Sequence, residues 1–198
     1  PWVMADLCAQ AIREEIEPEY VEQLATKRLR EEHATAFFPL LRESNPAVNS
    51  RSIRVLQQLG AATTVRAYEL IATCREPSTQ DRLTGWLISG WITDVGLIRL
   101  RQLLNGCRQL EVFLLWIQPS MQGSTDAIAD MIILGKHSIG KYLKEIKLVF
   151  EDELGIVFEN RGAHSVAYQW AIQEGIVNPR ISSVDMGTTE QQVNTIDG

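Results

Sequence analysis

Apolar side chains recur at intervals of three or four residues along most of this chain, the pattern of helices that bury one face. The pattern predicts helices over residues 2–16, 18–38, 50–59, 63–75, 79–92, 95–104, 107–118, 125–154 and 163–173. No long stretch alternates between apolar and polar residues, so a large sheet is not expected. We therefore predict an all-α fold, a multi-helix globular bundle of about eight to nine helices.

Proline residues mark where several of the predicted helices end. Pro18, Pro77 and Pro119 separate neighbouring segments, because proline cannot continue the interior of a helix. Pro39 lies inside the apolar run AFFPLL, where we expect a kink or a break. Asn45-Pro46 is the expected turn of a loop over residues 43–49.

The segment 125–154 carries the longest amphipathic pattern of the chain. At 100° per residue its apolar side chains fall on an arc of roughly 120°: Ile128, Met131, Ile132, Ile139, Tyr142, Leu143, Ile146, Val149 and Phe150. Gly135 and Gly140 lie within this segment and weaken it locally, by up to about 1 kcal/mol each relative to alanine. They mark the place for a bend or for close contact with another helix.

The domain organisation follows from the same pattern. Residues 1–176 are predicted to form a single helical domain, and a sub-division would fall near the polar loop 119–124. After Ile176 the chain becomes polar and has few large apolar residues, so residues 177–198 are predicted to form an extended, flexible C-terminal tail or arm.

Composition and charge restrict the possible functions. Hydrophobic residues make up 45% and charged residues 22%, which is ordinary for a globular protein and argues against disorder. The net charge is −6 at pH 7, whereas proteins that coat nucleic acid with their whole surface are usually basic. Any contact with nucleic acid therefore needs a local basic patch.

Lysines are concentrated in the segment 125–154. Lys136, Lys141, Lys144 and Lys147 all lie outside its apolar arc, which would suit contact with phosphate or with an acidic partner. The alternative is a solvated outer face with acidic residues as counter-charges. That arrangement is the norm for a helix, and it favours the alternative.

Arginines are scattered over several predicted helices, and we take five of them as candidates for contact with nucleic acid: Arg51, Arg54, Arg99, Arg101 and Arg108. Guanidinium groups on separate helices could line a groove that binds phosphate. The alternative, which is more frequent for any single arginine, is an ordinary ion pair at a surface or interface.

No catalytic, metal or cofactor motif is present. Cys8, Cys74 and Cys107 are far apart and have no neighbouring cysteine or histidine, so we predict buried free thiols in a reducing compartment and no metal site. Acidic and basic residues interrupt the N-terminal apolar run, so no signal peptide is expected. No apolar stretch approaches membrane-spanning length, so a membrane partner is not expected and the cytoplasm or a virion is the predicted location.

The segment KRLREEHATAFFPLLRESNP, residues 27–46, places a basic–acidic helix end before an aromatic–proline turn. In this it resembles a segment in the C-terminal lobe of bornavirus-type nucleoproteins. The resemblance covers 20 of the 198 residues and rests on EEH, the FP pair and the following proline. We transfer no functional residue from it.

These features predict a non-enzymatic, self-assembling helical structural subunit of the coat or nucleocapsid kind. Such a subunit would form homo-oligomers and hold RNA in a local basic groove. The alternative is a cytosolic helical domain that acts in protein interaction or regulation. A third hypothesis is an enzyme with a pocket between helices, although no nucleophile–base pair supports it.

Overall fold

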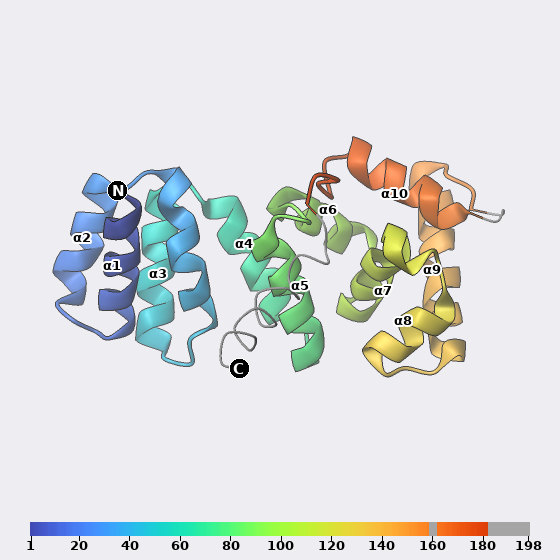
Figure 1. The fold of residues 1–198 in the computed structure, drawn as a ribbon, viewed down its shortest axis with the longest axis horizontal. Coiled ribbons are helices and arrows are strands. Elements are labelled where there is room, and N and C mark those ends of the chain that lie inside the picture. Colours follow the sequence, from blue (N-terminus) through green and yellow to red (C-terminus); the bar gives the residue numbers. More distant parts are fainter. Residues whose placement is uncertain (159–161, 182–198) are drawn as a thin grey trace, which may run out of the picture. The chain divides into compact units, whose positions relative to one another are not determined.

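The computed structural model describes residues 1–158 and 162–181, which contain ten α-helices, two 3-10 helices and no strand (Figure 1). The chain divides into two compact units, Pro1–Glu69 and Leu70–Gly198, with the boundary inside the helix Ala62–Ala72. The all-α class is confirmed. The described residues hold more helices than expected, partly because two of the predicted helices are each divided.

The first unit contains helices α1 (Trp2–Arg13), α2 (Pro18–Arg28) and α3 (Pro46–Gln58), the 3-10 helix η1 (Glu31–Arg42) and the start of α4 (Ala62–Ala72). Helix α1 packs against α2, α3 and η1, and α3 packs against α2 and η1 (Figure 1). The largest fully buried side chains come from three of these elements: Ile12, Phe37, Leu40 and Leu56.

The predicted helix 18–38 is divided at Leu29 and Arg30, which are extended. The backbone N–H of Arg30 donates to Nδ1 of the buried His33 at 3.1 Å, which fixes the start of η1. Pro39 lies inside η1, where the expected kink takes the form of 3-10 geometry. In an α-helix the proline ring would clash with a carbonyl of the preceding turn.

The second unit is built around helix α7 (Cys107–Ile117), in which every residue from Gln109 to Ile117 is buried. Around it pack α5 (Pro77–Ser89), α6 (Asp94–Leu103), η2 (Pro119–Met121), α8 (Thr125–Ile132), α9 (Lys136–Leu154) and α10 (Ala163–Gln173) (Figure 1). A helix that is apolar on nearly all sides is a core helix, and α7 occupies that place.

The predicted long helix 125–154 is two helices, α8 and α9. Ile133 adopts the left-handed conformation, with φ 53° and ψ 50°, and ends α8. Gly135 is extended and precedes α9. The prediction of one continuous helix was wrong because the apolar stripe keeps its spacing across the break. The apolar stripes of α8 and α9 both face the core of the second unit.

The first residues of the predicted tail belong to the fold. Val177 is buried, as is Ile176 at the end of the predicted domain, and Val177 forms an isolated antiparallel bridge with Ile92. The backbone N–H of Asn178 donates to the carbonyl of Trp91 at 2.8 Å. The prediction of a free arm is therefore wrong for residues 177 and 178. Residues 182–198 of the predicted tail lie outside the described residues.

Within residues 1–158 and 162–181, no helix combines the length and the apolar character that crossing a bilayer requires.

Candidate nucleic-acid interface

Arg51 and Arg54 are engaged in ion pairs inside the first unit. Arg51 on α3 contacts Glu19 at 3.0 Å and Glu22 at 3.7 Å, both on α2. Arg54 donates to both carboxylate oxygens of Glu22, at 2.7 and 3.0 Å. A hydrogen bond from its own backbone, followed by the hydrogen bond from Arg51, lowers the pKa of Glu19 below its ordinary value. These arginines therefore hold α2 and α3 together.

The lysines of α9 project from its outer side. Lys141 and Lys144 are exposed, and Lys136 is also exposed and contacts Asp126 at 2.8 Å. That carboxylate raises the pKa of Lys136, through its hydrogen bond first and its charge second. Lys147 is half-buried, with its Nζ 5.8 Å from the ring centroid of Trp116. Lys141 and Lys144 are thus the pair best placed to meet a partner.

Arg101 and Arg108, two of the predicted arginines, meet at one hollow of about 390 Å³ in the second unit. We call it the arginine hollow, and it is lined by residues 73–76 and 105–109 together with Arg101, Tyr142 and Glu145. Arg75 also lines it, although the sequence analysis did not select that residue. Arg99, the remaining predicted arginine of this unit, is exposed on α6 and is not among the lining residues.

The arginine hollow combines basic and acidic groups. Nη1 of Arg101 donates to the carbonyl of Leu104 at 3.0 Å, while its Nε is buried without a hydrogen-bond partner. Glu76 and Glu145 also line the hollow and partly offset its positive charge. Because Tyr142 and Glu145 belong to α9, the hollow adjoins the helix that carries Lys141 and Lys144.

A buried carboxylate holds Arg108, one of the residues that line this hollow. Glu111 on α7 is fully buried and accepts hydrogen bonds from Thr79 at 2.6 Å, Arg82 at 2.5 Å and Arg108 at 3.1 Å. A buried charge is tolerated only when it is paired and hydrogen-bonded, as here. Glu111 therefore fixes the position of Arg108 at the edge of the hollow.

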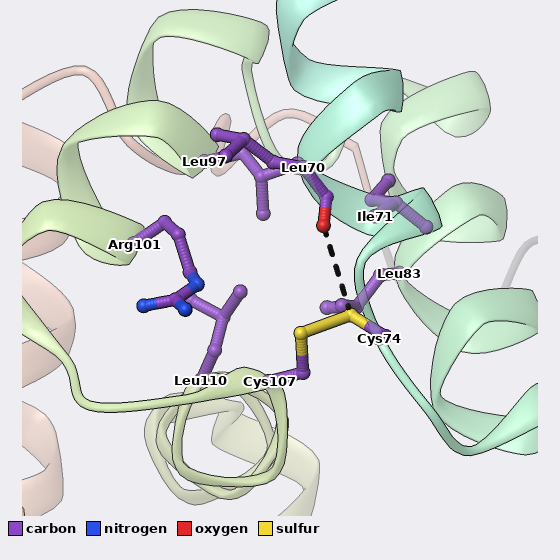
Figure 2. Close-up of a pocket in the computed structure, with 8 residues that line it drawn as sticks. All are labelled: Leu70, Ile71, Cys74, Leu83, Leu97, Arg101, Cys107 and Leu110. Atoms are coloured by element: carbon purple, nitrogen blue, oxygen red, sulfur yellow. Dashed lines mark hydrogen bonds between the residues drawn. A yellow bond between two sulfur atoms is a disulfide. The ribbon is translucent and has the colours of Figure 1, made fainter.

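Cys74 and Cys107 form a disulfide, with their Cα atoms 5.6 Å apart. Figure 2 shows it joining the segment after α4 to the start of α7, with Arg101 extending from α6 toward the same small apolar space. Cys8 is free and buried, and burial raises its pKa. The prediction of free thiols is confirmed for Cys8 and wrong for the other two. The pair gives no support to the predicted reducing compartment, where disulfides are rare.

The cysteine pairing and Arg75 escaped the sequence analysis for the same reason. Cys74 and Cys107 are 33 residues apart, and neither has a cysteine or histidine close by in sequence. Arg75 follows Cys74 directly, so only the pairing of the two cysteines brings it to residues 105–109. Only the knowledge that Cys74 and Cys107 are paired would have allowed both features to be predicted.

In the part of the chain that the structure describes, no group of three or more His, Cys, Asp or Glu side chains is arranged to hold a metal ion. No protein-family model, curated protein or solved structure matches this chain.

Proposed function

We propose that this protein is a non-enzymatic helical structural subunit that holds nucleic acid at a local basic surface of its second unit. The observation that carries the proposal is the arginine hollow, where Arg75 and Arg101 line one cavity beside the lysine-bearing helix α9. The coat or nucleocapsid character, RNA as the ligand and self-assembly are parts of this proposal.

The physical basis is contact with phosphate in an otherwise acidic protein. Guanidinium groups stay charged and can donate two parallel hydrogen bonds to a phosphate. Lys141 and Lys144 add mobile cations on the adjoining helix. Because the net charge is −6, binding is expected at this surface only and not over the whole molecule.

The pairing of the other basic residues narrows the proposed site. Arg51 and Arg54 are paired with carboxylates of α2, and Arg108 is paired with Glu111, so we leave these three arginines out of the interface. Lys147 lies over Trp116, and a change there would disturb packing as well as charge. The residues that we propose to contact phosphate are therefore Arg75, Arg101, Lys141 and Lys144.

A second candidate function, protein interaction, is favoured by the outer face of α1. This helix buries the small residues Ala5, Cys8 and Ala9 together with Ile12. Two larger apolar residues point the other way: Val3 is 72% and Leu7 61% exposed. Apolar groups gathered on an outer face are typical of a contact surface. We propose that a second copy of the chain covers this outer face of α1. The protein would then both self-associate and bind nucleic acid.

The test is a titration of single-stranded RNA against the full chain at several salt concentrations. We expect the double variant Lys141→Glu and Lys144→Glu to bind at least tenfold more weakly. The salt dependence should also fall by about 0.7 for each lost phosphate contact. Lys27→Glu with Arg28→Glu is the matched control, because it makes the same charge change on exposed residues of the first unit.

Equal weakening by both double variants would show that only net charge matters, and it would contradict the proposed site. Wild-type protein that ignores RNA at low salt would overturn nucleic-acid binding altogether. Far-ultraviolet circular dichroism of each variant checks that the helices remain intact.

A further inference from the structure

The disulfide forms part of the wall of the arginine hollow. Cys74 and Cys107 both line it, but their exposure differs. Cys74 is 4% exposed, whereas Cys107 is only partly buried in the first turn of α7. Cys107 is therefore the more exposed residue of the pair.

The same two cysteines also line a second, much smaller space. Its other lining residues are Leu70, Ile71, Leu83, Leu97, Arg101 and Leu110, and it is too small to admit a water molecule (Figure 2). Of these two spaces, the arginine hollow is the one that admits solvent.

The charge of the hollow favours one class of reagent. Thiol–disulfide exchange is carried out by thiolates, whose approach is helped by nearby cations. Arg75 and Arg101 line the same hollow as Cys107 and carry permanent positive charge, whereas Arg108 is paired with the buried Glu111. Glu76 and Glu145 also line the hollow and offset part of the positive charge. A thiol that carries a carboxylate or a sulfonate in addition to its thiolate is attracted more strongly than a neutral thiol.

We infer that Cys107 is the entry point of a thiol-exchange site that selects small anionic thiols. A thiolate attacks Sγ of Cys107 and forms a mixed disulfide there, while the bond to Cys74 breaks. The electron pair goes to the sulfur of Cys74, which takes a proton from solvent. A second thiolate attacks the outer sulfur of the mixed disulfide and releases Cys107. The protein gains two electrons, and two small thiols become one disulfide.

In the reduced state, the thiol of Cys74, which is the leaving group of the exchange, has a hydrogen-bond acceptor close by. The carbonyl oxygen of Leu70 lies 3.9 Å from Sγ of Cys74, the contact drawn as a dashed line in Figure 2. A disulfide sulfur carries no proton, so the contact becomes a hydrogen bond only after reduction, when the thiol can donate. This inference does not depend on nucleic-acid binding, and either can fail without the other.

The first test needs no variant. Oxidised full-length protein is exposed to 2-mercaptoethanesulfonate, 2-mercaptoethanol or cysteamine at equal thiolate concentration, then quenched with acid and analysed by mass spectrometry. We expect the sulfonate to react fastest and cysteamine slowest, with a spread of roughly tenfold at low salt. The spread should shrink at high salt because the charges are screened. The first adduct should sit on Cys107.

Variants then test the hollow itself. Arg75→Gln should reduce the preference for the sulfonate, while Arg99→Gln, on an exposed arginine outside the hollow, should leave it unchanged. With the anionic disulfide 5,5′-dithiobis(2-nitrobenzoate), Cys107 in a Cys74→Ser variant should react faster than Cys74 in a Cys107→Ser variant.

Any one of the following results would overturn the inference. Equal rates for the three thiols would remove the role of charge, and a first adduct on Cys74 would place the entry point on the wrong sulfur. A disulfide that reacts only in denaturant would show that the hollow gives no access. Two free thiols after treatment with an oxidised small thiol would show that the pair does not form.

Discussion

At the scale of single residues, Ile133 adopts a backbone conformation that is unfavourable for its branched side chain. It is a β-branched residue in the left-handed region, with φ 53°, and its side chain is 91% exposed. The left-handed conformation costs about 1–2 kcal/mol for such a residue. The strain is retained because the backbone N–H groups of Ile133 and Leu134 both reach the carbonyl of Ala129, which closes the end of α8.

Replacing this residue should therefore stabilise the protein. We expect Ile133→Gly to raise the free energy of unfolding by about 0.5–1 kcal/mol, because glycine adopts this conformation freely and little buried surface is lost. Urea unfolding followed by circular dichroism measures the change. Lys144→Gly, at an exposed position inside α9, is the control and should lower the free energy of unfolding by about 1 kcal/mol. A loss of stability in both variants would contradict a left-handed Ile133.

At the scale of elements, helix α7 determines how the second unit is held together. It packs against α5, α6, α8, α9 and α10, and its one acidic side chain is fully buried. Glu111 joins Arg82 of α5 to Arg108 of its own helix, so the ion pairs hold α5 and α7 in register. The arginine hollow lies on the same framework, because Arg108 is fixed by this carboxylate.

Removing the buried carboxylate should destabilise this unit. We expect Glu111→Ala to lower the free energy of unfolding by about 1–3 kcal/mol, because the buried Thr79 and the partly buried Arg82 and Arg108 lose their acceptor. Chemical denaturation gives the value. Glu153→Ala, an exposed carboxylate of α9, should change it by less than about 0.5 kcal/mol. A similarly small effect at both positions would show that the buried cluster contributes little.

At the scale of the whole molecule, the outer face of α1 bears on the proposed self-association. Val3 and Leu7 are four residues apart, so they lie on the same side of the helix, opposite the buried Ala5, Ala9 and Ile12. This orientation leaves large apolar groups in water while small ones fill the core. Covering that face with a second copy would remove the exposed apolar surface.

The double variant Val3→Glu and Leu7→Glu should abolish self-association, because charge on this face opposes its burial. Size-exclusion chromatography with light scattering gives the molar mass of each form. Ile88→Glu with Val95→Glu changes exposed apolar residues of the other unit and should leave the molar mass as in the wild type. A wild-type protein that is monomeric at all concentrations would contradict self-association through any surface.

The sequence by itself determined what depends on neighbours along the chain. The helical class, the breaks at Pro18, Pro77 and Pro119 and the outward position of Lys141 and Lys144 follow from local spacing and from proline chemistry. The continuous apolar run over residues 112–117 is likewise buried along its whole length. These features can be predicted without knowing which helices pack against one another.

The tertiary structure alone decided which distant residues meet. It put the side of α1 with small residues in the core, paired Cys74 with Cys107 and brought Arg75 into the lining of the same hollow as Arg101 and Arg108. It also paired Arg51 and Arg54 with carboxylates of α2. The physical reason is that contacts across 30 or more residues arise from the packing of whole helices, and local hydrophobic spacing carries no information about the partner.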